Sequence, residues 1–470
     1  MKLNSAKIYF ILSYALALFI ILSNVSYAAP SLSDTSESMP IVKTRDSKES
    51  LVTPTRMSIP SPSVPVGIIS NPAAVNNSLT GTGVAEGYLQ GLFGIKDNHG
   101  INFGGAYLAD TNGIMSGGVQ NAQQWQSDSL FLLNLNIDTN KLLGWEGGTF
   151  YAQFLQFNGQ NVNGQVGSVQ GYNSLPVPPD FDRTELYQIW LSQLFANNMF
   201  LVRVGKLSAT NDFSNVLQPD QLDQEKLYIP SVSGLIFTPV FENPTMVGVA
   251  PGYYNSAYGV EMFFLPNKYW YLSAGAYDGS GAQGAQTGLN NLPTFNGSGF
   301  YIAEAGANWL LGKDNYPGKF GIGGWDEIGV IQGATPTSTE FGAQGLYVFG
   351  SQRLWYKDPG YDISGISMYY QYGYNNSSVL PMNQSFGGGF TLFDLIPNRP
   401  GDSMGIGFSL ASLNQAIFNR PDELMYQTYY QAKVINNIYL EPAVTYIPTP
   451  GASSSLAPAW TGTLRLVVLF

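Results

Sequence analysis

Apolar and polar side chains alternate with a period of two residues from about residue 81 to the end of the chain. In 404–410, for example, Met, Ile, Phe and Leu share one face, and Gly and Ser occupy the other. This period predicts β-strands with one apolar face, not amphipathic helices. The stretches with the clearest alternation are 258–264, 303–309, 365–374, 404–410 and 423–434.

Two architectures share this alternation. A soluble β-sandwich turns its apolar residues inward, whereas a membrane barrel turns them outward to lipid. The polar faces here carry Gly, Asn, Gln and isolated charges, and aromatic residues gather near predicted strand ends, as in 268–271 and 308–309. Both features favour a barrel with a water-filled lumen and aromatic girdles. We therefore predict an all-β fold, a transmembrane antiparallel β-barrel of about 16 strands in one chain.

The N-terminus predicts export. Lys2 and Lys7 precede the apolar run 8–22, and Ser26-Tyr27-Ala28 fits a cleavage site with small residues at both ends. Residues 1–28 are therefore predicted to be a signal peptide, with an uncleaved anchor helix as the alternative. Residues 29–78 are rich in Ser, Thr and Pro and predict a disordered tail, which leaves 79–470 for the barrel.

Turn signals subdivide the barrel region. Asn-Gly and Pro-Gly pairs such as Asn112-Gly113 and Pro317-Gly318 predict short turns between strands. The Gly-, Ser- and Asn-rich stretches 158–180 and 278–298 predict large loops on the outer face of the membrane. The last predicted strand alternates and ends on Phe470, as in barrels that use a C-terminal aromatic residue for recognition by the assembly machinery; the terminal strand of a sandwich is the alternative.

Composition narrows the function classes. The 470 residues hold 21 Lys and Arg against 32 Asp and Glu, a net charge of −11, so there is no basic surface for nucleic acid. The chain has no cysteine and a single histidine, His99. An outer-membrane phospholipase would need His99 beside a serine nucleophile, and no serine motif supports one. The oxygen-rich stretches 110–112 and 314–315 lack the spacing of a calcium loop. We expect no enzyme activity, no cofactor and no metal.

Several short motifs are distributed over residues 79–470. They include Leu79-Thr80-Gly81, Phe181-Asp182-Arg183-Thr184-Glu185, Arg203-Val204-Gly205-Lys206 and Leu440-Glu441-Pro442. With these motifs the chain resembles the carbohydrate-selective porins of the OprB family. One departure is Gly83-Val84, which stands where that family usually carries Trp-Gly-Gly.

The resemblance implies a bacterial outer-membrane pore for passive diffusion of small carbohydrates such as glucose into the periplasm. Two alternatives stay open: a plugged structural or binding barrel, and a secreted β-sandwich that binds sugars. The oligomeric state is also open, with a homotrimer as one choice.

Charged and aromatic residues at predicted inward positions are the candidate site. A cation opposite a carboxylate offers both donors and acceptors to sugar hydroxyls, and aromatic rings offer stacking surfaces. The alternative is that Arg203 and Glu185 form a structural ion pair in the barrel wall. Candidates for the pore constriction are Arg203, Glu185, Lys206, Trp125 and Tyr172. Further predicted lumen charges, with solvation and cross-strand pairing as the alternative role, are Glu261, Glu304, Glu423, Lys433 and Arg465.

Overall fold

The computed structural model describes ten stretches of the chain. They are 100–119, 125–175, 182–217, 234–252, 255–267, 269–279, 297–332, 338–357, 364–435 and 438–470. The predicted signal peptide 1–28, the predicted tail 29–78 and His99 lie outside the described residues.

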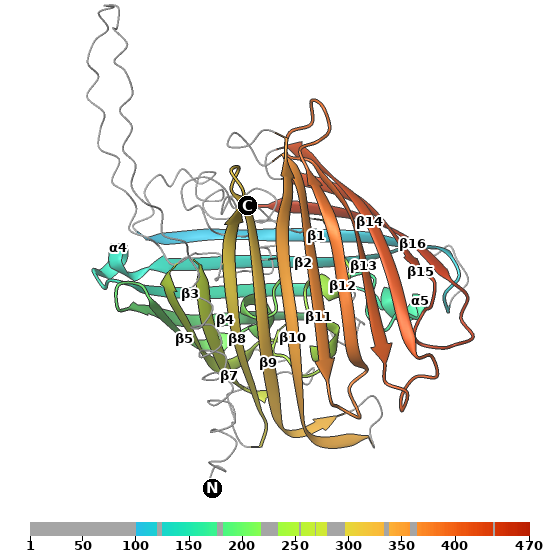
Figure 1. Cartoon of the computed structure of the whole chain (residues 1–470), viewed down its shortest axis with the longest axis horizontal. Helices are drawn as coiled ribbons and strands as arrows, with labels where there is room; N and C mark the ends of the chain where they lie inside the picture. Colours follow the sequence, from blue (N-terminus) through green and yellow to red (C-terminus); the bar gives the residue numbers. More distant parts are fainter. Residues whose placement is uncertain are drawn as a thin grey trace, which may run out of the picture. The chain divides into compact units, whose positions relative to one another are not determined.

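Sixteen strands within the described residues form the molecule's framework (Figure 1). The prediction of a barrel of about 16 strands is confirmed. The strands are β1 Ile101–Ser116, β2 Trp125–Asp138, β3 Gly148–Asn158, β4 Arg183–Phe195, β5 Phe200–Leu207, β6 Ala257–Asn267, β7 Trp270–Asp278, β8 Gly299–Leu311, β9 Tyr316–Gln332, β10 Thr339–Tyr356, β11 Gly365–Asn375, β12 Met382–Phe393, β13 Ser403–Leu413, β14 Asp422–Ile435, β15 Ile438–Ile447 and β16 Ala459–Leu469.

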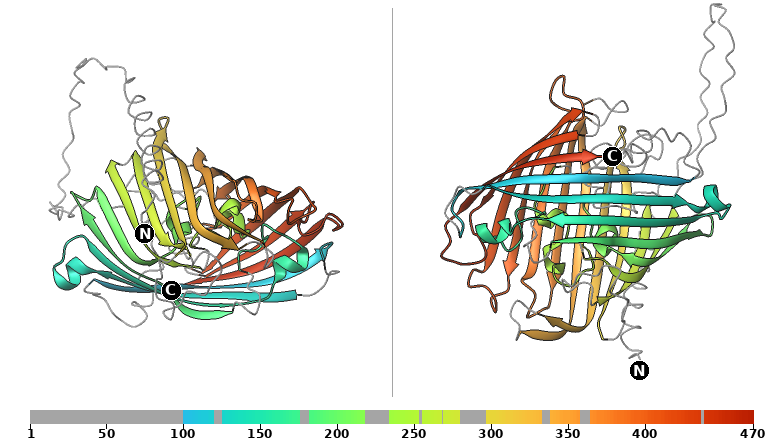
Figure 2. Two further views of the ribbon diagram at one scale, coloured as in Figure 1. Left: turned by 90° about the horizontal axis from the view of Figure 1, so that it is seen from below. Right: turned by 180° about the vertical axis from the view of Figure 1, so that it is seen from behind.

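Each strand pairs antiparallel with its neighbours in sequence, and β1 pairs with β16 to close the barrel (Figures 1 and 2). The closing register places Asp110 opposite Arg465. Phe470 completes the seam, because its backbone exchanges two hydrogen bonds with Gly105 of β1. Its ring stacks on Phe131 of β2 at a centroid distance of 5.6 Å. A closed sheet leaves no unpaired edge, as a membrane-spanning sheet requires.

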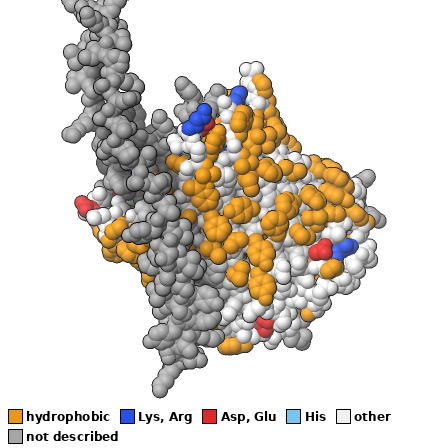
Figure 3. All heavy atoms as spheres, in the orientation of Figure 1, with side chains coloured by type: hydrophobic (Ala, Val, Ile, Leu, Met, Phe, Trp, Pro, Cys, Tyr) orange, Lys and Arg blue, Asp and Glu red, His pale blue; other side chains and the backbone are white. Residues whose placement is uncertain are grey.

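The alternating pattern sorts side chains as predicted. Apolar residues such as Val204 and Met262 point outward and are 51% and 57% exposed. Their strand neighbours Arg203 and Glu261 point inward and are buried. Figure 3 shows hydrophobic side chains gathered over the strands, with few charges on that face. This surface suits contact with lipid.

The described helices are short. They are α4 Thr139–Leu143, α5 Val162–Val166, α6 Ala209–Asp212, and the 3₁₀ turns η3 Thr238–Val240 and η4 Pro244–Met246. Helix α4 follows β2, with the Asp138 side chain capping its start and left-handed Gly144 ending it. Within the described stretches, no helix has the length and apolar character needed to cross a bilayer.

Two turn predictions were wrong. Asn112-Gly113 lies inside β1 and Pro317-Gly318 lies inside β9. The Asn112 side chain is hydrogen-bonded to neighbouring strands, so it does not need a turn to satisfy its amide. Gly113 leaves room for the Trp125 ring, which would lie 3.0 Å from an added Cβ.

Candidate functional site

Two connections fold into the barrel and cover its inner wall. The first inserted segment, 159–175, joins β3 to β4. The second inserted segment, described at 208–217 and 234–252, belongs to the connection from β5 to β6. The prediction that 158–180 forms a loop on the outer face needs correction for its described part. Residues 159–175 are largely buried, and their backbone bonds to inward-facing wall residues.

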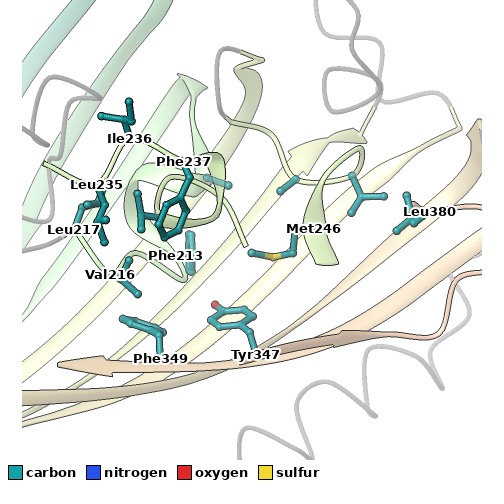
Figure 4. Packing of buried hydrophobic residues seen from close by; sticks show 14 of the residues in the cluster. Phe213, Val216, Leu217, Leu235, Ile236, Phe237, Met246, Tyr347, Phe349 and Leu380 are labelled. Atoms are coloured by element: carbon teal, nitrogen blue, oxygen red, sulfur yellow. The ribbon is translucent and has the colours of Figure 1, made fainter. Parts of the chain in front are cut away.

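Apolar packing holds the second segment in place. Phe213, Val216 and Phe237 from this segment join one buried cluster with Tyr347 and Phe349 of β10. Figure 4 shows the segment's side chains over these two wall aromatics. Full burial of an aliphatic or aromatic side chain contributes about 1.5–3 kcal/mol to stability. Several such residues therefore hold the segment in one position against the wall.

Small wall residues make this close approach possible. A Cβ added at Gly407 of β13 would lie 2.6 Å from the Leu235 side chain. A Cβ added at Gly373 of β11 would lie 2.3 Å from the Asn243 side chain. Both glycines occupy the inward face, and a larger residue at either would displace the inserted segment.

The two inserted segments are bonded to each other. The Ser174 N–H donates to the Ile236 carbonyl at 2.8 Å, and the Thr238 N–H donates to the Gly171 carbonyl at 3.0 Å. These backbone bonds resemble a short strand pairing. Movement of one segment therefore disturbs the other.

Gln427 of β14 fixes both segments to the wall. Its Oε1 accepts from the N–H groups of Ile236 and Phe237 at 2.7 and 3.1 Å. Its Nε2 donates to the Tyr172 carbonyl at 3.0 Å and to the Thr445 hydroxyl at 2.8 Å. The candidate Tyr172 thus lies in the first inserted segment, with its ring fully buried. Burial raises the pKa of its hydroxyl above the ordinary value, so the side chain is neutral.

Arg203 is the buried cation of the second segment's attachment. Its guanidinium lies 2.7 Å from Glu261 of β6 and 2.7 Å from Asp212 of α6. It also stacks over the Trp190 ring at 4.5 Å. One cation thus joins the wall to the inserted helix.

Glu304 of β8 attaches the same segment a few residues later. Its carboxylate accepts from the Ser214 N–H at 2.7 Å and from the hydroxyls of Tyr271 and Tyr347 at 2.7 and 2.8 Å. Three donors satisfy a carboxylate that would otherwise be costly to bury.

Glu423 of β14 anchors the first segment. It accepts from the N–H groups of Val169, Gln170 and Gly451 at 2.9, 2.9 and 2.6 Å, and from the Ser168 hydroxyl at 2.9 Å. Four donors around one buried carboxylate bind this segment firmly to the wall.

The barrel seam provides the second anchor of the first segment. Arg465 donates two parallel bonds of 2.8 Å to Asp110. Asn173 donates to Asp110 and Asn112 at 2.7 Å each. These partners occupy the oxygen-rich 110–112 stretch. Among the described residues, no group of three or more His, Cys, Asp or Glu side chains could hold a metal ion.

The predicted pairing of Arg203 with Glu185 is wrong. Ser192 lies opposite Arg203 in the β4–β5 register. Glu185 is seven residues from Ser192, about 23 Å along the strand. Its carboxylate instead lies 4.0 Å from Arg183.

The remaining candidates occupy separate places. Lys206 is fully buried, and its Nζ donates to the carbonyls of Leu186 and Tyr187 at 3.1 Å each. Trp125 lies on the outward face of β2 and is 65% exposed, so it does not face the lumen. Lys433 is half-buried near the end of β14, where its N–H donates to Asp402 at 2.8 Å. The structure therefore does not gather the ten candidates in one ring.

Other residues of the network were not predicted from the sequence. Gln427 and Gln170 contact partners far away in the chain, whereas Asp212 contacts Arg203, nine residues before it. The alternation in 423–434 places Gln427 on the polar face, but it does not indicate its partners. Asp212 follows the Arg203-Val204-Gly205-Lys206 motif by six residues, and this motif is the sequence signal nearest to it.

Comparison with known proteins decides the family. A family model described as "Carbohydrate-selective porin, OprB family" matches residues 122–470. The chain belongs to the OprB family. As an OprB-family porin, it is an outer-membrane channel and not an enzyme, which confirms the sequence predictions on both points.

Relatives agree with this assignment. Porin B of Pseudomonas aeruginosa is 21% identical to this porin over 432 residues, covering 79% of this chain and 88% of that protein. The high pH structure of Pseudomonas putida OprB has a TM-score of 0.66 at 16% identity, covering 79% of this chain and 95% of that one. The low pH structure of the same protein has a TM-score of 0.50 at 14% identity, covering 82% and 96%. At these identities the structural likeness concerns the fold.

Proposed function

We propose that this OprB-family porin lets small neutral carbohydrates such as glucose diffuse passively into the periplasm. The observation that carries the proposal is the pair of inserted segments, which are firmly attached inside the barrel and narrow it. A narrow passage favours monosaccharides over larger sugars by size.

The state of the inner charges supports a neutral substrate. The inner charged side chains form their hydrogen bonds with the wall and the inserted segments. These side chains are Arg203, Glu261, Glu304, Glu423 and Arg465. A charged solute gains little from groups that are already paired, and it loses hydration in a narrow passage. Uncharged polyols lose less hydration free energy in the same passage.

We also propose that Arg203 acts on permeation through the second inserted segment. Its guanidinium is 2% exposed, and both of its carboxylate partners are buried. Its effect on selectivity therefore comes from holding Asp212 in place.

Liposome swelling with the purified protein tests the function. Glucose, a disaccharide and gluconate are compared at equal osmotic strength, with the lipid-facing Val204→Ile variant as control. Fast glucose entry, slow disaccharide entry and slow gluconate entry are expected from both proteins. A folded, inserted protein that passes none of the three would favour a plugged binding barrel instead.

A further inference from the structure

One aromatic residue of the second inserted segment is only half-buried. Across the described 234–252, every residue is buried except Phe241, Val247 and Gly248. Phe241 packs on one side against the inner cluster that contains Phe237 and Tyr347. The segment lies inside the barrel, so the accessible part of Phe241 is within reach of a solute in the lumen.

The backbone around Phe241 is fixed. The N–H groups of Phe241 and Glu242 both donate to the Thr238 carbonyl, at 2.8 and 3.1 Å. On the other side, Asn243 accepts from the Ser385 hydroxyl at 3.1 Å and donates to the Tyr372 carbonyl at 3.3 Å. A ring held in this way can contact a solute without first losing conformational freedom.

Glu242 differs from the buried glutamates that attach the inserted segments to the wall. Glu261, Glu304 and Glu423 each accept at least two hydrogen bonds. Glu242 is 6% exposed, its carboxyl oxygens keep some accessible surface, and they make no hydrogen bond or ion pair with the described part of the chain. A buried polar group without a protein partner is costly unless another molecule satisfies it.

The chemistry of Glu242 suits an uncharged partner. Burial raises the pKa of this carboxyl to about 8, so the neutral acid predominates at pH 7. A neutral carboxylic acid has one O–H donor and a carbonyl acceptor. A sugar hydroxyl can both accept from the O–H and donate to the carbonyl.

We propose that Phe241 and Glu242 form a contact site for a hexopyranose in transit. The Phe241 ring lies against the apolar C–H face of the sugar, and the Glu242 carboxyl exchanges hydrogen bonds with its hydroxyls. This pairing of one aromatic face with one polar group is common in small-molecule sites. The site is weak, since a conducting pore must release what it binds. The inference rests on the proposed function and adds the residues that the sugar contacts.

Glucose titration of single-channel current in planar bilayers tests the site. Glucose is expected to reduce the ion current saturably, and sorbitol, which has no ring, to reduce it less at equal concentration. Phe241→Leu should weaken the apparent glucose affinity about threefold to tenfold, the usual range for one aromatic contact. Val247→Leu, at a half-buried position on the same segment, is the matched control and should leave the affinity unchanged.

Two substitutions of Glu242 separate its hydrogen bonding from its shape. Glu242→Gln keeps one donor group and one acceptor, and should hold the glucose affinity within about twofold at pH 7. Glu242→Leu removes both and should weaken affinity at least as much as Phe241→Leu. Unchanged ion conductance without sugar shows that each variant is folded and inserted.

The outcomes are distinct. Equal glucose affinity in Phe241→Leu and the wild type, or in Glu242→Leu and the wild type, would overturn the site. Equal losses in Val247→Leu and Phe241→Leu would overturn it as well. Glucose flux through the wild type without any saturable block would also remove the site while leaving the proposed function intact.

Discussion

Replacing Arg203 should loosen the second inserted segment without opening the barrel wall. The guanidinium bridges Glu261 of the wall and Asp212 of α6, with 2.7 Å contacts to each. Arg203→Met keeps an apolar stem against the Trp190 ring but leaves two buried carboxylates without their cation. The strand pairing of β5 with β4 and β6 depends on backbone bonds and should persist.

The expected cost follows from burial. Removing one partner of a buried ion pair usually destabilises a protein by about 3–5 kcal/mol, because the remaining charge stays desolvated. Arg203 has two such partners, so we expect the upper part of this range. Replacing the whole set with neutral groups is often close to neutral in stability. The triple variant Arg203→Met, Asp212→Asn, Glu261→Gln should therefore recover most of the loss.

Urea unfolding in detergent, followed by tryptophan fluorescence, measures the effect, and single-channel conductance reports the passage. The single variant should unfold at lower urea and conduct more, since the segment around Asp212 moves away. A loss under about 1 kcal/mol, or a triple variant no more stable than the single one, would refute the reasoning.

Three further predictions concern the inserted segments. Glu423→Gln replaces one carboxylate oxygen with an NH2 group, which then faces hydrogen-bond donors instead of accepting from them. The free energy of unfolding should therefore fall by about 2–4 kcal/mol. A variant as stable as the wild type would contradict the role of Glu423 as an anchor. Gly407→Leu should displace Leu235 and raise both the conductance and the permeation of the disaccharide. An unchanged conductance would contradict the packing of the second inserted segment against β13. The folded pKa of Glu242, about 8, exceeds the value near 4.5 in the unfolded chain. Its contribution to stability is therefore complete below pH 4.5 and is lost as pH rises through 8. Urea midpoints measured from pH 5 to 9 should show this fall, and Glu242→Gln should reduce it; an equal fall in that variant would argue against the assignment.

The sequence predicted the strands well because each needs only a local period of two. In β13, Ile406 and Leu410 point outward and Ser409 points inward, as their alternation indicates. The Asn112-Gly113 turn failed because a strand tolerates this pair once neighbouring strands satisfy the amide. Local turn propensity gives way to tertiary hydrogen bonding at such a position.

The inserted segments were harder to predict. Ser168 and Glu423 are 255 residues apart in the chain, yet they are hydrogen-bonded. The rule for large loops correctly separated 159–175 from the strands, but it carries no information on whether a loop turns outward or inward. That choice depends on wall residues from strands far along the sequence, such as Gly407 and Gln427.

The ratio of glucose to disaccharide permeation, measured by liposome swelling for the wild type and for Arg203→Met, tests the central claim most directly. If the attached inserted segments make this porin a passage for small sugars, the wild type should pass glucose much faster than the disaccharide, and the variant should narrow that difference. A wild type that passes both sugars equally, or a destabilised variant whose ratio is unchanged, would contradict the account.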